Sequence, residues 1–92
     1  MRYAIRPTAR FAKDLKRIQR RGYRIELLTE VIRQLSEGEP LPESRRDHPL
    51  GGVFLGCREC HIQPDWLLIY ELDGSSLILY LTRTGTHSDL FV

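Results

Sequence analysis

The order of apolar and polar positions divides the chain into a helical first half and a β-rich second half. Across residues 2–6, two apolar residues alternate with basic ones up to Pro7, which predicts a short strand. The next segment begins at Thr8, a residue type that caps helices, and ends at Gly22, a residue type that terminates them. Within this helix the apolar residues recur at helical spacing and should face the core: Phe11, Ala12, Leu15 and Ile18.

A second helix is predicted from about Tyr23 to Ser36. Its charged residues lie opposite an apolar face, Gly38 stops it, and residues 39–42 form a proline-containing connector. Two helices joined by so short a turn predict a helical hairpin that lies on a sheet. The inner face of this second helix consists of Leu28, Val31, Ile32 and Leu35.

Three strands are predicted in the second half of the chain. The first two span residues 56–62 and 66–72 and are joined by a Gln-Pro-Asp turn at residues 63–65. The Asp-Gly pair at residues 73–74 is a strong hairpin signal, and the last strand covers residues 76–84. All three strands should therefore be antiparallel neighbours.

The remaining segments complete the expected architecture. Residues 47–52, which contain a proline and two glycines, are expected to form a loop, and residues 86–91 one helical turn. The order β-α-α-β-β-β predicts an α+β fold, in which a two-helix hairpin packs on one face of a mainly antiparallel twisted sheet. A chain of 92 residues is expected to form a single domain over residues 1–92.

Composition also indicates where the protein acts. No stretch reaches the roughly 18–20 apolar residues of a membrane span. Residues 1–10 lack the apolar segment of a secretory signal. We therefore expect a cytoplasmic protein that does not enter a membrane.

The charge of the chain is unevenly distributed, although the net charge is only +2. Residues 1–24 contain nine basic residues and one acid, Asp14, and arginine outnumbers lysine twelve to two over the whole chain. Arginine forms forked contacts to phosphate, so this bias indicates a polyanionic partner. A solvated helix face is the alternative explanation.

The segment from Cys57 to His61 has the Cys-x-x-Cys-His spacing of a c-type haem attachment site. Residues three apart in a strand face opposite sides of a sheet, so Cys57 and Cys60 should diverge. A zinc site would need further cysteine or histidine ligands at compatible spacing. We therefore expect two reduced thiols, and neither a metal nor a cofactor.

Each of the three histidines lies in a predicted loop or at a predicted strand end in the β-rich half. His61 ends one strand, and Asp65 lies close enough after the turn to share a site with it. His48 lies in the preceding loop and His87 follows the last strand. Histidine titrates near neutral pH, so this clustering indicates acid–base catalysis.

Cleavage of RNA would suit such a site, because RNA supplies its own nucleophile, the 2′-hydroxyl. The reaction then needs a base, an acid and a cation for the phosphorane charge, and Arg83 could be that cation. Phe91 could stack on a nucleobase, or it could be a core residue that anchors the tail.

Several phrases of the second half, in the same order, resemble the YafQ-type toxins of the RelE/ParE superfamily. The resemblance spans residues 47–91, whereas the first half is similar only in its strand–helix–helix plan. The phrases are Asp47-His48-Pro49-Leu50, Gly56-Cys57-Arg58-Glu59-Cys60-His61, the run from His61 to Tyr70, Arg83-Thr84-Gly85-Thr86-His87, and Leu90-Phe91.

The resemblance implies a ribosome-dependent endoribonuclease that cuts mRNA in the A site without a metal, by attack of the 2′-hydroxyl on the adjacent phosphate. It implies that His48 or His61 is the general base and His87 the general acid. Asp65 would orient a histidine or share the base role, and Phe91 would position a nucleobase. The substrate-binding residues expected beside them are Arg83, Arg45, Arg46, Lys13 and Arg17.

The resemblance also implies partners. A cognate antitoxin would neutralise the protein, and operator DNA would be contacted only through that antitoxin. The basic first helix would face ribosomal RNA, the acidic tail of the antitoxin, or both in turn. The alternatives are a non-catalytic inhibitor such as the ParE branch that poisons gyrase, and a simple nucleic-acid-binding module.

Overall fold

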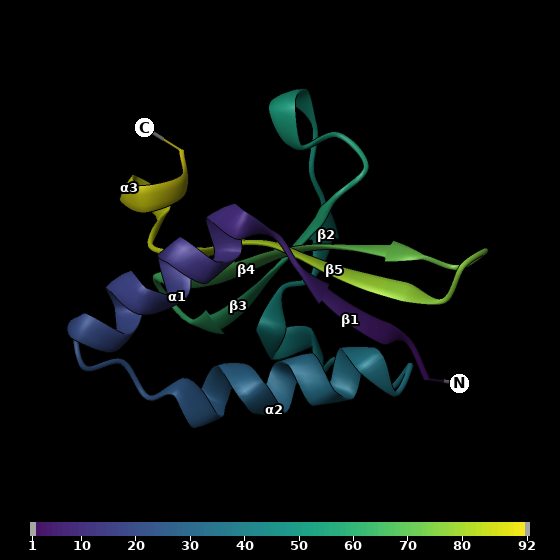
Figure 1. The fold of residues 1–92 in the computed structure, drawn as a ribbon, viewed down its shortest axis with the longest axis horizontal. Coiled ribbons are helices and arrows are strands. Elements are labelled where there is room, and N and C mark those ends of the chain that lie inside the picture. The colour runs from purple at the N-terminus through teal and green to yellow at the C-terminus, as the bar shows by residue number, and fades with distance from the viewer. Residues whose placement is uncertain (1, 92) are drawn as a thin grey trace.

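Five strands form one mixed sheet in the computed structural model, which describes residues 2–91 (Figure 1). The sheet has the order β1-β5-β4-β3-β2, so the first strand lies beside the last. The strands are β1 (Ala4–Pro7), β2 (His48–Pro49), β3 (Arg58–Gln63), β4 (Trp66–Asp73) and β5 (Ile78–Gly85). Two main helices, α1 (Ala9–Arg20) and α2 (Ile25–Ser36), precede the antiparallel part of the sheet.

Strand pairing confirms the predicted α+β fold with a mainly antiparallel sheet. The pairs β2–β3, β3–β4 and β4–β5 are antiparallel, and β1 pairs with β5 in parallel. A hairpin cannot join parallel strands, and the long connection between β1 and β5 contains both helices and the three other strands. As a result, residues from both ends of the chain meet along β5.

The loop predicted over residues 47–52 was wrong in part, because His48 and Pro49 form the edge strand β2. The proline is compatible with this place because an edge strand leaves some N–H positions unused. Two residues are too few for a sequence alternation to be visible. Two 3₁₀ turns flank β2: η1 (Glu43–Arg45) precedes it and η2 (Gly52–Phe54) follows it.

Local capping sets the start of α1 as expected. The Thr8 hydroxyl accepts a hydrogen bond of 3.0 Å from the backbone N–H of Phe11. The second helix begins two residues later than predicted, at Ile25, after the turn at Gly22, whose φ is 80°. Tyr23 lies in this connection and packs its ring edge against Trp66 at 5.1 Å between centroids.

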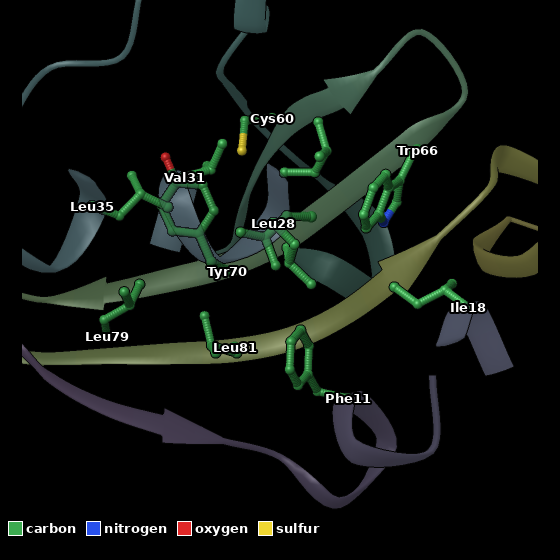
Figure 2. Packing of buried hydrophobic residues seen from close by; sticks show 12 residues of the cluster. Phe11, Ile18, Leu28, Val31, Leu35, Cys60, Trp66, Tyr70, Leu79 and Leu81 are labelled. Atoms are coloured by element: carbon green, nitrogen blue, oxygen red, sulfur yellow. The ribbon is translucent and has the colours of Figure 1, made fainter. Parts of the chain in front are cut away.

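The main core fills the space between the two helices and one face of the sheet (Figure 2). It joins every long element, so truncating one of its residues would loosen the helices from the sheet. Its buried members are Phe11, Ile18, Leu28, Val31, Leu35, Cys60, Ile62, Trp66, Leu68, Tyr70, Leu79 and Leu81.

A smaller apolar cluster lies on the opposite face of the sheet. Its buried residues are Cys57, Leu67, Ile69 and Leu90, and they are covered by Leu50 and Phe54. Cys57 belongs to this cluster and Cys60 to the main core, which confirms that the two thiols diverge across β3. The short helix α3 (His87–Leu90) covers this second face.

The hairpin connections hold the reactive positions at one end of the sheet. Only Pro64 and Asp65 separate β3 from β4. At the far end, the Asp73 carboxylate accepts hydrogen bonds from the backbone N–H groups of Ser75 and Ser76 and shapes the β4–β5 loop. Among the helices that the structure describes, none is both long enough and apolar enough to cross a membrane.

Candidate active site

Three of the predicted site residues form a row on the sheet face opposite α1 and α2. His61 projects from the outer face of β3, and its ring centroid lies 5.9 Å from that of His87 at the start of α3. The Phe91 ring follows at 6.4 Å from the His87 ring. Residues from β3 and from the C-terminal segment thus converge, as the sequence predicted.

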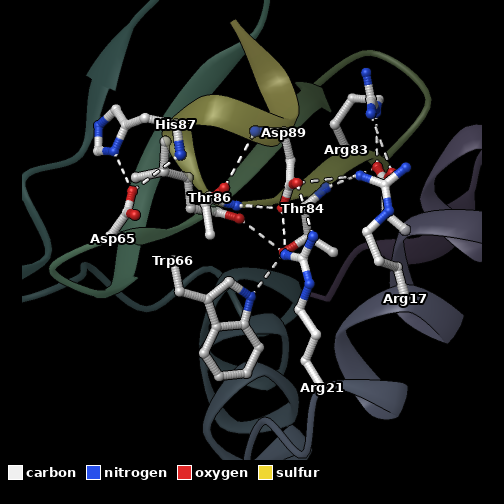
Figure 3. A network of polar contacts seen from close by, with 11 residues as sticks. Arg17, Arg21, Asp65, Trp66, Arg83, Thr84, Thr86, His87 and Asp89 are labelled. Carbon is white, nitrogen blue, oxygen red and sulfur yellow. Dashed lines mark hydrogen bonds and ion pairs between the residues drawn. The ribbon is translucent and has the colours of Figure 1, made fainter. Parts of the chain in front are cut away.

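Asp65 completes this row from the β3–β4 turn, but its partner is His87 and not His61. The Asp65 Oδ1 atom lies 2.6 Å from Nδ1 of His87 and accepts the His87 backbone N–H at 3.0 Å (Figure 3). These two bonds, the backbone one first, lower the pKa of Asp65 below its ordinary value. Asp65 is therefore a carboxylate that holds one histidine.

The contact with Asp65 defines the chemistry left to His87. A carboxylate only accepts hydrogen bonds, so Nδ1 of His87 carries the proton in this contact. The ring's second nitrogen, Nε2, has no hydrogen-bond partner among residues 2–91. His87 can therefore give or take a proton through Nε2 while Asp65 keeps the ring oriented.

His48 lies in the same site region, and its partner is Glu59, which the sequence reasoning did not name as a site residue. The Nε2 atom of His48 lies 3.2 Å from Oε2 of Glu59, and Nδ1 lies 2.6 Å from the carbonyl oxygen of Arg46. Both ring nitrogens thus face oxygen atoms, which hold the His48 ring between Arg46 and Glu59. The strand alternation that places Glu59 on the face of His61 was the available signal.

Glu59 itself is unusual among the carboxylates of the chain. It is only 5% exposed, and within the described residues its Oε1 atom has no hydrogen-bond partner. A buried carboxylate oxygen with no partner is costly, so such a group needs a functional or electrostatic reason. Glu59 lies beside His48 and two residues before His61, and this place in the site is a reason for its burial.

Asp47 fixes the segment that carries His48. It accepts a hydrogen bond of 2.6 Å from Nε of Arg58 and a second bond from the hydroxyl of Tyr70. Both partners lie in strands of the sheet. Asp47, the residue before β2, therefore anchors this edge strand to β3 and β4.

Phe91 is the half-exposed end of the row rather than a core residue. Its side chain is 48% exposed and meets the edge of Phe54 at 5.8 Å between ring centroids. Leu90, only 7% exposed, anchors the tail in the second apolar cluster. The Phe91 ring is thus supported by Phe54 and still half-exposed, so part of it is available for stacking.

Two of the predicted substrate-binding arginines lie in a shallow depression beside His61, which also includes Gln63. Arg45 is half-buried, and its Nη1 donates to the carbonyl oxygen of Ile62 at 2.8 Å. Arg46 is exposed and forms no ion pair with any residue in the range 2–91. The depression therefore presents positive charge next to a catalytic candidate.

Arg83 is already bound to a partner within the fold (Figure 3). Its Nε and Nη2 atoms donate to the carboxylate of Asp14 on α1 at 2.6 and 3.0 Å, and the pair is almost fully buried. Asp14 also accepts the backbone N–H of Thr84 at 3.1 Å. Within the described residues only Nη1 of Arg83 is without a partner, and its role toward phosphate stays a prediction.

The two predicted contacts from α1 differ from each other. Lys13 is exposed and forms no ion pair within residues 2–91, so its side chain can meet a polyanion. Arg17 instead lies 3.4 Å from Asp89 of α3, where Arg21 also binds. Arg17 of α1 and Arg21, the residue that follows this helix, therefore form ion pairs within the fold.

The cysteines take no part in this arrangement. Both are free and buried, and burial raises the pKa of the Cys60 thiol to about 12. Cys60 is therefore neutral at physiological pH and is not a nucleophile. Within residues 2–91, no three histidine, cysteine or acidic side chains converge as a metal-binding group.

The site thus consists of a histidine–carboxylate pair that faces a second histidine on a small α+β sheet, and comparison with known proteins identifies the family. The family model described as "Bacterial toxin of type II toxin-antitoxin system, YafQ" matches residues 3–92. The chain belongs to the YafQ toxin family, which confirms the resemblance drawn from the sequence.

Characterised relatives agree with this assignment. The chain is 39% identical over 85 residues to the mRNA interferase toxin YafQ of Escherichia coli K12, covering 91% of this chain and 90% of that protein. It superimposes on a chain of the E. coli DinJ-YafQ toxin-antitoxin complex with a TM-score of 0.90 and 36% identity over the whole of both chains. A metal-bound toxin from Helicobacter pylori gives a TM-score of 0.90 at 39% identity, covering 97% of this chain and 99% of that chain.

Proposed function

We propose that this protein is an endoribonuclease that cleaves mRNA in the A site of the ribosome. The observation that supports it most strongly is the facing pair of His61 and His87, with His87 bound to Asp65. The E. coli relative named an mRNA interferase toxin is similar over nine-tenths of the chain. Two separated proton-transfer groups are what attack by a 2′-hydroxyl requires.

His61 is the general base in this proposal. Its ring forms no hydrogen bond with residues 2–91, whereas both nitrogens of His48 face acceptors. His61 therefore has a nitrogen available to accept the 2′-hydroxyl proton. The freed 2′-oxygen then forms a bond to the adjacent phosphorus.

His87 is the general acid. Its Nε2 would donate a proton to the departing 5′-oxygen as the phosphorus–oxygen bond breaks, giving a 2′,3′-cyclic phosphate and a 5′-hydroxyl. The His61 and His87 ring centroids lie 5.9 Å apart, so both rings could contact the same phosphate from one side. Asp65 stabilises the protonated form of His87 and keeps its orientation.

The remaining site residues would stabilise charge and hold the substrate. His48, held by Glu59, would border the phosphate site. Arg83 would contact the phosphate through Nη1, the nitrogen that Asp14 leaves unused. Such contacts act on charge that develops in the transition state, where their effect on rate is largest.

Substrate binding would use surfaces on either side of the histidines. Phe91 would stack on a nucleobase, a contact of about 1–3 kcal/mol. Arg45 and Arg46 would line the path of the RNA backbone, and Lys13 and Arg17 would meet ribosomal RNA. The contacts of these four basic side chains would weaken as salt concentration rises, because each neutralises a phosphate.

The proposal includes an antitoxin as a second partner. A solved E. coli relative forms a toxin–antitoxin complex with DinJ. We propose that a cognate antitoxin binds this chain in the cytoplasm, that it covers the histidine face, and that operator DNA is contacted only through it. Inhibition and cleavage would then exclude each other.

A reconstituted cleavage reaction tests the proposal. Purified protein is added to an mRNA positioned on ribosomes, to the same mRNA without ribosomes, and to an mRNA with one 2′-deoxy nucleotide at the cut position. We expect cleavage only of the all-ribose mRNA on ribosomes. Equal cleavage of free mRNA would reject the ribosome requirement, and cleavage at the 2′-deoxy position would reject the 2′-hydroxyl as nucleophile.

A further inference from the structure

Asp89 joins the C-terminal segment to the first helix (Figure 3). Its carboxylate accepts hydrogen bonds of 2.7 and 3.1 Å from Nη1 and Nη2 of Arg21, and Nη1 of Arg17 lies 3.4 Å away. The same carboxylate accepts the backbone N–H of Thr86 at 2.9 Å and so closes the capping box of α3. The Asp89 side chain therefore both caps α3 and joins it to α1.

The helix α3 needs such an anchor because it has only four residues. An isolated helix of that length is unstable in water, so tertiary contacts must hold it. Its other anchor is Leu90, which is buried in the second apolar cluster. The direction of His87 and Phe91 is then determined by Asp89 and by the contact of His87 with Asp65.

The junction before α3 shows how closely Asp89 is packed. A Cβ atom on Gly85 would lie 2.8 Å from Oδ2 of Asp89, which is too short for ordinary contact. Gly85 also has a φ of 151°, a conformation that glycine adopts readily and other residues do not. The backbone between β5 and α3 thus passes directly against the carboxylate.

We propose that Asp89 is a positioning residue for the cleavage reaction and that Arg21 acts through it. The Arg21–Asp89 pair fixes α3 and so sets the direction of the His87 ring relative to His61, whose ring centroid lies 5.9 Å away. The inference rests on the proposed nuclease function, since it assigns the pair a role in that chemistry. Neither residue would touch the RNA in performing this role.

The same pair controls the charge around His87. Asp89 faces Arg17 and Arg21 from α1, Arg83 from β5, and Asp65 across the site, and its negative charge opposes ionisation of Asp65. With Arg21 in place this charge is largely neutralised. Without Arg21 the negative charge of Asp89 would no longer be neutralised. That charge would favour the protonated form of neighbouring groups, so the pH–rate profile would move to higher pH.

Single-turnover cleavage on ribosomes tests the proposal with Arg21→Ala, Asp89→Asn and the double variant. Asparagine can still accept the Thr86 N–H, so Asp89→Asn removes the link to α1 while it keeps the cap. We expect each single variant to lower kcat by about 10–100-fold with little change in KM, because a small misplacement of a catalytic group has that cost. The double variant should be no slower than the slower single variant.

The matched control is Arg33→Ala, which removes an exposed arginine of α2 from its ion pairs with Glu30 on the same helix and with Glu39 in the connector that follows. It should cleave at the wild-type rate. Arg21→Lys, which keeps the charge, should recover part of the lost rate. Its pH profile should stay near that of the wild type, whereas that of Arg21→Ala moves to higher pH.

The alternative role for Arg21 is direct contact with ribosomal RNA. In that case Arg21→Ala would raise KM, Asp89→Asn would not, and the two effects would add, which would overturn the proposal. A wild-type protein that fails to cleave would instead reject the proposed function. The ring resonances of His87 in ¹⁵N NMR spectra then decide separately: an unchanged His87 signal in Asp89→Asn would overturn the positioning role, and a shifted one would support it.

Discussion

Asp65 and His87 are joined twice, although they lie 22 residues apart. One carboxylate oxygen of Asp65 lies 2.6 Å from the His87 ring nitrogen Nδ1 and also accepts the His87 backbone N–H at 3.0 Å. The β3–β4 turn and the start of α3 are thereby locked together. This link converts an exposed histidine into one with a defined proton position and a defined direction.

The first prediction concerns that link. Asp65→Asn should lower the cleavage rate by about 10²-fold or more, because the asparagine cannot stabilise the protonated His87 ring. His87→Ala should lower it further, and adding Asp65→Asn to His87→Ala should have little additional effect. Rate constants for cleavage of ribosome-bound mRNA by the two single variants and the double variant measure these losses. Independent, multiplying losses would show that Asp65 acts on another group.

The second prediction concerns stability at low pH. Partners hold the carboxylates of Asp65 and Asp89 in the charged form and lower the pKa of each below its ordinary value. A carboxyl group with a lowered folded-state pKa contributes stability that is fully present above the unfolded-state pKa and is lost as pH falls through the folded-state pKa. Resistance to urea should therefore decline below about pH 4.

Two variants check the origin of this decline. Asp89→Asn should be less stable than the wild type at neutral pH and should lose less stability between neutral pH and the acid range. Glu71→Gln is the control, because Glu71 is exposed and forms no ion pair within residues 2–91. If Asp89→Asn and the wild type lose equal stability on acidification, the Asp89 contacts are not the cause.

The third prediction concerns the buried pair of Asp14 and Arg83, whose side chains are 2% and 11% exposed. Asp14→Ala should lower the free energy of unfolding by about 3–5 kcal/mol, because it leaves the Arg83 charge buried without a partner. Arg33→Ala, which breaks exposed pairs, should cost less than about 1 kcal/mol. Urea unfolding followed by Trp66 fluorescence measures both. Equal losses would mean that burial does not govern the effect.

The fourth prediction contrasts two apolar side chains. Leu68 is fully buried beneath the helices, and Leu68→Ala should cost about 2–5 kcal/mol of unfolding free energy. Val53, in the loop after β2, is 95% exposed, and Val53→Ala should change stability by no more than about 0.5 kcal/mol. A large loss from Val53→Ala would indicate that the loop packs in solution against another surface.

Much of this structure could be predicted because local rules decided it. Strand alternation placed Cys57 and Cys60 on opposite faces, and the fold does so. The Thr8 cap and the short turn before Trp66 also follow from residue type and spacing. Each of these features depends on neighbours within a few positions.

The parts that escaped prediction depend on residues far apart in the chain. Asp14 meets Arg83 across 69 positions because β1 lies parallel to β5 and brings α1 beside it. Nothing local distinguishes Asp14 from a solvated acid. The same holds for Asp89, whose partner Arg21 was read as part of a basic surface.

The candidate site was predicted in its members more fully than in its pairing. The structure brings His48, His61, Asp65 and His87 into one region, but Asp65 binds His87 and not His61, and His48 binds Glu59. Pairing depends on side-chain directions at a bulge near His61, where the β3–β4 register shifts. Period-two alternation does not describe that irregularity.

The ribosome-dependent nuclease function is best tested by transcriptome-wide mapping of mRNA ends after brief expression of the wild type and of His87→Ala. We expect wild-type ends to cluster at in-frame codon positions and to disappear when translation is blocked, and His87→Ala to produce neither these ends nor growth arrest. Full growth arrest by both His61→Ala and His87→Ala, without new mRNA ends, would reject the nuclease function and favour a non-catalytic inhibitor.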